Sequence, residues 1–233
     1  MVVRDGLGRR ILGECIDFLL PQHCAACGRF GASLHAECME AFPRALGPRC
    51  VRCWRPGPGT WCERCASGAS DVAFDALRTP FRFEGDVRRV VLEAKFRGVT
   101  AHLGPLARTA AASVPPEWRI DAVTGVPLAS GRQRRRGYNQ ASMLARGVAA
   151  ALDVRTRVDL VRRVRATPPQ AGLSAEERRR NLLDAFAVRG VPPETVLLVD
   201  DVTTTGATLS VVARALKDAG AERVYALAVA RED

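Results

Sequence analysis

The sequence predicts an α/β fold with a doubly wound, mostly parallel sheet, preceded by a small cysteine-rich module. Seven of the eight cysteines lie between residues 24 and 65, and none occurs beyond residue 71. From residue 74 onward, apolar stretches typical of strands alternate with stretches of helical spacing. Such alternation is typical of a sheet covered by helices on both faces. We therefore expect an amphipathic helix at 1–20, a metal-binding module at 21–68 and an α/β domain at 71–233.

Four strands and four helices are expected in the α/β domain. Helical spacing is clearest at 85–96, where apolar residues recur at intervals of three and four. The stretch 196–199 is wholly apolar, which indicates a parallel strand buried on both faces. The expected strands are 74–83, 120–126, 196–199 and 224–230, and the expected helices are 85–96, 101–112, 139–152 and 207–219.

The composition is that of a folded protein, because 47% of the 233 residues are hydrophobic. No apolar run approaches the roughly 20 residues that a membrane-spanning helix needs. The N-terminus has no apolar core followed by a cleavage site, so a signal peptide is not expected. The sequence therefore predicts a cytoplasmic protein without membrane insertion.

Positive charge is concentrated in one part of the chain. The formal net charge is +10, and residues 131–180 hold thirteen arginines against four acids, which amounts to +9. A local positive field of this kind suits phosphate groups, either on a small ligand or on a nucleic acid. A solvated arginine-rich face is the alternative interpretation.

Four short motifs supply eight potential metal ligands. A C-x-x-C turn places two thiolates on one side of a tight knuckle, and two such knuckles complete the tetrahedral shell that zinc prefers. Disulfides are disfavoured in a cytoplasmic chain, and a redox site of the thioredoxin kind uses one C-x-x-C. We expect one or two structural zinc ions, with sequential pairing of the motifs preferred and cross-braced pairing left open. The expected ligands are Cys24, Cys27, His35, Cys38, Cys50, Cys53, Cys62 and Cys65.

The most informative stretch runs from Val196 to Leu209. An apolar strand is expected to end at the adjacent carboxylates of Asp200 and Asp201, and a loop of threonines and one glycine then leads into a helix. Backbone N–H groups at a helix N-terminus bind anions, and the carboxylates suit ribose hydroxyls. There is no lysine of a triphosphate-binding loop and no G-x-G-x-x-G motif. The pattern predicts a site for a phosphorylated ribose, whereas a simple helix cap would need only one such residue.

This stretch resembles the phosphoribosyl pyrophosphate (PRPP) signature of type I phosphoribosyltransferases. Further features narrow the resemblance to the ComF (ComFC) family of competence-related proteins, which combines a double zinc ribbon with that domain. One of these features is the set of cysteine motifs, and the other two are the stretches named below. Together with the Val196–Leu209 stretch they cover almost the whole chain. These stretches are Val126-Pro127-Leu128 through Asn139-Gln140, and Thr167 through Ser174 continuing to Arg178 and Asn181.

The resemblance implies a role for each part of the site. Asp200 and Asp201 would contact the ribose hydroxyls as the catalytic carboxylates, and Mg²⁺ would accompany PRPP. The 5′-phosphate would be bound by Thr203, Thr204, Thr205, Gly206, Ala207 and Thr208. The pyrophosphate would face Arg132, Arg134, Arg136, Asn139 and Gln140. Residues 165–181 would form a flexible loop over the site. Ala129-Ser130 replace the usual His-Pro, and Thr203 replaces an aliphatic residue.

Three functions agree with these features. The first is a phosphoribosyltransferase whose acceptor the sequence does not identify. The second is a protein that binds single-stranded DNA during uptake, together with other competence proteins, and the third is a PRPP-binding regulator without turnover. A phosphoribosyltransferase covers its acceptor with a further part of the chain, called the hood. Here we expect only the cysteine-rich module and residues 1–20 to be able to form it.

Overall fold

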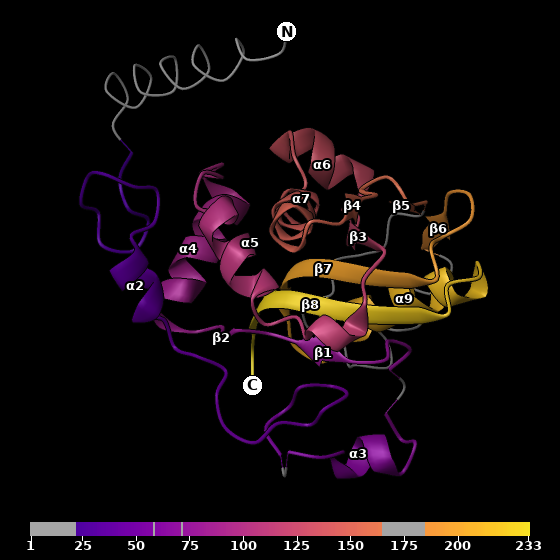
Figure 1. Ribbon diagram of the computed structural model, residues 1–233. Coiled ribbons are helices and arrows are strands. Elements are labelled where there is room, and N and C mark those ends of the chain that lie inside the picture. The colour runs from indigo at the N-terminus through magenta and orange to yellow at the C-terminus, as the bar shows by residue number, and fades with distance from the viewer. Residues whose placement is uncertain (1–21, 58, 71, 165–184) are drawn as a thin grey trace, which may run out of the picture.

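The computed structural model describes residues 22–57, 59–70, 72–164 and 185–233 (Figure 1). The helix predicted at 1–20, Cys15 within it, and the whole loop predicted at 165–181 lie outside these ranges. Among the described residues, no helix is both long and apolar enough to cross a membrane.

A six-stranded parallel sheet forms the centre of the α/β part, in the order β1-β8-β7-β3-β4, with β2 also paired to β8. The two long strands β7 and β8 lie side by side in the middle of the molecule (Figure 1). The strands are β1 (Leu77–Arg78), β2 (Phe81–Arg82), β3 (Ala122–Gly125), β4 (Arg155–Thr156), β7 (Thr195–Thr203) and β8 (Arg223–Arg231).

Helices cover both faces of this sheet. Alternate residues of β7 point to opposite faces: Leu197 and Val199 pack among the apolar residues of α4, α5 and α7, whereas Val196 and Leu198 pack against α9. The doubly wound fold predicted from the sequence is therefore confirmed. The helices are α4 (Gly85–Phe96), α5 (Leu103–Ala111), α6 (Ser130–Arg136), α7 (Gln140–Leu152) and α9 (Ala207–Asp218), with a 3-10 turn η1 (Pro116–Trp118).

Three details differ from the sequence-based expectations. The strand expected at 74–83 is broken into β1 and β2 at Thr79-Pro80, since proline has no N–H to donate to a ladder. An antiparallel pair, β5 (Val161–Arg163) and β6 (Phe186–Val188), was not foreseen. Strand β7 does not end at the carboxylates, because it continues to pair with β8 as far as Thr203.

The connections create a crevice between β3 and β7. From β3 the chain continues through α7 to β4 on one side, whereas from β7 it continues through α9 to β8 on the other side. Ligands of open α/β sheets bind at the carboxyl ends of the strands at such a switch point. Helix α7 begins close to β3, because Gly125 has no side chain: a Cβ atom there would lie 2.6 Å from the backbone of Ala141.

The cysteine-rich part consists of two similar halves with the short helices α2 (Ala36–Glu40) and α3 (Glu63–Ala66). In both halves the residue after the second cysteine of the first knuckle has positive φ. This residue is Gly28 in the first half, with φ 76°, and Trp54 in the second, with φ 60°. A tryptophan accepts this strain because its indole Nε1 donates to the carbonyl of Thr79 at 3.0 Å, which fastens the second half to the sheet.

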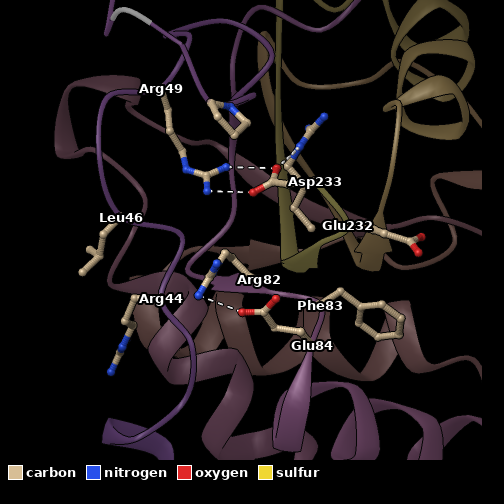
Figure 2. A pocket seen from close by; sticks show the side chains of 10 residues that line it. Arg44, Leu46, Arg49, Arg82, Phe83, Glu84, Glu232 and Asp233 are labelled. Atoms are coloured by element: carbon tan, nitrogen blue, oxygen red, sulfur yellow. Dashed lines mark hydrogen bonds and ion pairs between the residues drawn. The ribbon is translucent and has the colours of Figure 1, made fainter.

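The end of β8 holds the second half in place (Figure 2). Arg231 donates to the carbonyl oxygen of Cys53 at 3.0 Å, and its Nε donates to the Asp233 carboxylate at 2.9 Å. The same carboxylate pairs with Arg49 at 2.8 Å. Arg49 and Arg231 are 5% and 2% exposed, so their charges depend on Asp233 for compensation.

Candidate functional site

A pocket of about 220 Å³ lies at the carboxyl ends of β3 and β7. Its walls come from the end of α4, the segment after β3, the start of α7, strand β5 and the end of β7. The structure thus brings together seven residues that the sequence analysis assigned to one site. They are Asp200, Asp201, Thr208, Arg132, Arg136, Asn139 and Gln140.

The two carboxylates are held in defined positions within β7. The Asp200 side chain accepts from the N–H of Asp201 at 2.9 Å, and the Asp201 side chain accepts from the N–H of Val202 at 2.7 Å. Asp201 also forms an ion pair with Lys95, the two charged atoms lying 3.3 Å apart. Lys95 reaches this position because the Tyr138 hydroxyl donates to the carbonyl of Ala94 and ties the end of α4 to the segment before α7.

Asp200 has an unusual protonation equilibrium. Loss of solvent and the neighbouring charge of Asp201 raise the pKa of Asp200 to about 8, and the Asp201 N–H and the Lys95 charge offset this rise only in part. The Asp200 carboxyl of the free chain is therefore mostly protonated at neutral pH. Perturbed carboxyl groups of this kind are typical of functional sites.

Four cationic side chains line the pocket: Lys95, Arg132, Arg136 and Arg163. Arg132 and Arg136 belong to α6, a helix where the sequence analysis expected a loop. Their spacing of four residues places them on the same side of the helix, whereas Arg134 lies on the other side and does not line the pocket.

Asn139 and Gln140 have different tasks. Asn139 caps α7 by accepting from the N–H of Ala141 at 3.1 Å, and it donates to the carbonyl of Val126 at 3.0 Å, so it joins the helix to the end of β3. The Gln140 side-chain oxygen accepts from Arg136 at 2.8 Å. The Gln140 Nε2 atom is buried and has no hydrogen-bond partner among the described residues, and Gln140 lines the pocket, so this atom is available to a ligand.

The threonine-rich loop is shorter than predicted. Thr203 belongs to β7, its side chain is buried, and its carbonyl accepts from the N–H of Glu232 at 2.9 Å. The turn from Thr204 to Gly206 then leads into α9, whose N-cap is Gly206. Of the predicted phosphate-binding residues, only Thr208 lines the pocket. The N-terminus of the twelve-residue helix α9 nevertheless opens at this edge, with the partial positive charge of a helix start.

The eight predicted metal ligands form two clusters. The first two motifs form one cluster and the last two motifs form the other, so the motifs pair sequentially and not in a cross-braced way. One holds Cys24, Cys27, His35 and Cys38, and the other holds Cys50, Cys53, Cys62 and Cys65. Within each cluster the ligand atoms lie within 4.8 Å of one another. The Cys53 and Cys62 sulfur atoms are 3.7 Å apart, close to the edge of about 3.8 Å of a tetrahedral zinc–thiolate shell.

Despite burial, backbone hydrogen bonds lower the pKa of Cys24 and Cys50, one thiol in each cluster, whereas burial raises the pKa of Cys38 and Cys53. The N–H of His35 donates to the Cys24 sulfur at 3.4 Å, and in the second half the N–H of Cys62 donates to the Cys50 sulfur at 3.3 Å. A hydrogen bond from the Arg29 side chain lowers the pKa of Cys27 to about 5. The donor set, its spacing and these hydrogen bonds fit zinc in both clusters.

Comparison with known proteins agrees with this architecture. A model of the phosphoribosyl transferase domain matches residues 138–232. The DNA utilization protein YhgH of Salmonella typhi is 39% identical over 224 residues, which cover 91% of this chain and 98% of that protein. Competence protein ComFC of Streptococcus pneumoniae is 27% identical over 203 residues, covering 85% and 87%. The chain belongs to the ComF family.

The ComF assignment extends to a shorter match. Competence protein F of Haemophilus influenzae is 42% identical over 115 residues, and this match spans 48% of the chain and half the length of that protein. Among solved structures, glutamine PRPP amidotransferase from B. subtilis aligns with 55% of this chain and 26% of its own. The TM-score of that alignment is 0.38 and the identity is 21%.

Arg163 is the pocket residue that sequence reasoning missed in this ComF chain. It belongs to β5, which pairs with β6 across residues far apart in the sequence. No motif marks it, and the only signal was the high density of arginines at 131–180. Lys95 was only a weak candidate for a phosphate-binding residue, because its one distinguishing feature is its place near the end of the helix predicted at 85–96, shortly before Gly98.

The raised pKa of Asp200 makes a prediction for stability. Between about pH 4 and pH 8 the native ComF chain holds a proton on Asp200 that the unfolded chain releases, so the free energy of unfolding falls as pH rises through this range. Asp200→Asn removes this dependence. Relative to the variant, the unmutated chain should lose about 5 kcal/mol of stability between pH 4 and pH 8.5, because a shift of about four pKa units corresponds to that free energy. Urea unfolding at several pH values measures it.

Asp218→Asn is the matched control, because Asp218 is exposed at the far end of α9. It should leave the pH dependence unchanged. A difference in stability between Asp200→Asn and the unmutated chain that is the same at both ends of the pH range would contradict the prediction.

Proposed function

We propose that this ComF chain binds PRPP, or another phosphorylated ribose, in the cytoplasm at the carboxyl ends of β3 and β7. The observation that carries the proposal is the pair of adjacent carboxylates, Asp200 and Asp201, facing four cationic side chains across one pocket. Carboxylates suit the neutral ribose hydroxyls and cations suit phosphates, so the pocket offers both parts of the ligand its partner.

Each wall of the pocket receives one part of the ligand in this proposal. Asp200 and Asp201 accept hydrogen bonds from the ribose 2′- and 3′-hydroxyls. The turn from Thr204 to Gly206, with Ala207 and Thr208 in the first turn of α9, binds the 5′-phosphate at the helix N-terminus. The pyrophosphate faces Lys95, Arg132 and Arg136. Thr203 and Arg134 act indirectly, because Thr203 is a buried residue of β7 and Arg134 lies on the other side of α6 from Arg132 and Arg136.

Mg²⁺ fits the same pocket. Its preferred ligands are oxygens, and the raised pKa of Asp200 shows that the described protein cations do not fully compensate the paired carboxylates. A magnesium ion bound with the pyrophosphate would neutralise charge on the leaving group. The chain's own contribution to transfer is to orient the ribose with Asp200 and Asp201 and to stabilise the departing pyrophosphate with its cations.

A second proposed function is binding of single-stranded DNA during uptake, together with other competence proteins. A neighbouring pocket of about 490 Å³ shares Asn139 with the first one. Its lining includes Arg146, Arg162 and Arg189, against the single acid Asp159. This basic surface suits a phosphate backbone. The names of the relatives, competence protein F and DNA utilization protein, place those proteins in DNA uptake and use.

We further propose that each cysteine cluster holds one structural zinc ion. All four positions of a tetrahedral shell are supplied by the protein, so no position is left for a substrate. The 21–68 module is then a double zinc ribbon attached to the 71–233 domain.

PRPP binding is the first test. Calorimetry with the zinc-loaded chain should show Mg²⁺-dependent binding of PRPP. Asp200→Asn combined with Asp201→Asn should weaken it about 100-fold, since a hydrogen bond to a charged group contributes about 1.5–3 kcal/mol. Asp218→Asn should bind like the unmutated chain. If the unmutated chain gives no binding heat with PRPP and Mg²⁺, the proposed function is rejected.

Metal analysis tests the zinc proposal and the pairing of ligands. Protein purified without chelator should contain two zinc ions per chain. Cys24→Ser with Cys38→Ser should leave one, because both lie in the same cluster, whereas Cys24→Ser with Cys50→Ser should weaken both sites. A metal-free unmutated chain would overturn the proposal, and equal losses in the two double variants would overturn the pairing.

Salt dependence tests DNA binding. Fluorescence anisotropy with a labelled oligothymidylate should show an affinity that falls steeply with salt. Replacing Arg146, Arg162 and Arg189 by alanine should reduce the slope of log K against log salt by about 2, at roughly 0.7 per phosphate contact. Arg119→Ala, at an exposed residue outside this pocket, should not change it. Absent or salt-insensitive binding would reject this function.

A further inference from the structure

Two pockets of the α/β part have walls in common. One is the pocket of about 220 Å³ that contains Asp200 and Asp201, which we call the carboxylate pocket. The other is the neighbouring pocket of about 490 Å³, which we call the basic pocket. Three parts of the chain contribute to both of them: helix α6, strand β5 and Asn139 at the start of α7. The two pockets are therefore neighbours on one surface.

Helix α6 and strand β5 each supply side chains to both pockets. Within α6, Arg132 and Arg136 line the carboxylate pocket, and Gln133 lines the basic pocket. Within β5, Arg163 lines the carboxylate pocket, and its neighbour Arg162 lines the basic pocket. An α-helix with its side chains is about 10–12 Å across. The distance from one pocket to the other is thus about the width of one helix.

The joint surface of the two pockets carries an excess of positive charge. Its seven cationic side chains are Lys95, Arg132, Arg136, Arg146, Arg162, Arg163 and Arg189, and its three acids are Asp159, Asp200 and Asp201. Burial and the nearby charge of Arg132 lower the pKa of Arg163, so positive charges crowd one another here. Protonation of Asp200 in the free chain adds to the excess. Such a surface attracts the phosphates of a nucleic acid backbone.

An exposed aromatic ring lies at the mouth of the carboxylate pocket. Phe96 follows Lys95 at the end of α4, and the residue is 72% exposed. The guanidinium carbon of Arg136, which lines the pocket, lies 5.6 Å from the centre of the Phe96 ring. Single-stranded nucleic acids bind to surfaces of this composition, because the backbone follows the cations and a base stacks on the aromatic ring.

We propose that single-stranded DNA runs from the basic pocket over α6 to the mouth of the carboxylate pocket, so that DNA and PRPP exclude each other. One DNA phosphate occupies the position of the PRPP pyrophosphate beside Arg132 and Arg136, and a neighbouring base stacks on Phe96. The inference rests on both proposed functions, since it requires that the chain binds PRPP and that it binds DNA.

Exclusion makes each ligand a regulator of the other. PRPP must weaken DNA binding by the same factor by which DNA weakens PRPP binding, because coupling between two binding equilibria is reciprocal. Ribose 5-phosphate has no pyrophosphate, so it leaves the shared position open and binds together with DNA. The chain therefore releases DNA where PRPP is abundant.

Competition measures the exclusion. Anisotropy of a labelled oligothymidylate with the full-length, zinc-loaded chain should be recorded at fixed Mg²⁺ and fixed ionic strength. PRPP at about ten times its own Kd should raise the Kd for DNA about tenfold, as mass action requires for two ligands at one position. Pyrophosphate at the same multiple of its Kd should do the same. Ribose 5-phosphate, also at that multiple, should change the Kd for DNA less than about twofold.

Phe96→Ala tests the path of the DNA independently of the charges. It should weaken DNA binding about fivefold or more, because the chain loses a stacked base. It should leave the Kd for PRPP unchanged, since the ring is apart from the carboxylates and cations proposed to bind PRPP. Trp61→Ala is the control, because Trp61 is an exposed aromatic residue of the cysteine-rich part, and it should bind DNA like the unmutated chain. Circular dichroism should confirm that both variants are folded.

The possible failures are distinguishable. If PRPP and DNA both bind but PRPP leaves the Kd for DNA unchanged, or if ribose 5-phosphate competes as strongly as PRPP, the inference is overturned. Undiminished DNA binding by Phe96→Ala also overturns it. A chain that binds DNA but not PRPP rejects the PRPP function, a chain that binds PRPP but not DNA rejects the DNA function, and the inference falls with either.

Discussion

The structure depends on the way in which the chain leaves β3 and β7. After β3 it passes along one face of the sheet, and after β7 it passes along the other face. Because α7 covers one face and α9 the other, the carboxyl ends of the two strands border a crevice, and the pocket lies there. The missing side chain of Gly125 brings the start of α7 against β3, so Gln140 and the cations of α6 border the crevice. Residues of α4, α6, α7, β5, β7 and α9 thus meet at one edge of the sheet, together with the segment after β3.

The same edge holds the cysteine-rich module. The Arg231 guanidinium donates to the carbonyl of Cys53, a member of the second cysteine cluster, and the Asp233 carboxylate pairs with both Arg231 and Arg49. Removing Asp233 would leave two buried guanidinium groups without their carboxylate, which is strongly unfavourable. The second cysteine cluster is therefore part of the structure around the sheet edge.

Asp200 shows how a site can be kept at the expense of stability. A strand that is otherwise apolar carries two neighbouring carboxylates, and burial beside Asp201 raises the pKa of Asp200 to about 8. A hydrophobic residue there would suit the strand better, and the proposed role of the carboxyl in binding ribose hydroxyls accounts for its presence. The ion pair of Lys95 with Asp201 compensates only one of the two charges.

The sequence by itself determined the doubly wound fold, the two clusters of candidate metal ligands and the position of the carboxylate pair. These features depend on local patterns: apolar periodicity, C-x-x-C spacing and the adjacent Asp200 and Asp201. Only the tertiary structure decided that β7 continues to Thr203, since this depends on pairing with β8. Because α6 is a helix, Arg134 lies on the other side of it from Arg132 and Arg136. The pairing of β5 with β6 places Arg163 in the pocket. These outcomes depend on contacts between distant residues, which no local pattern records.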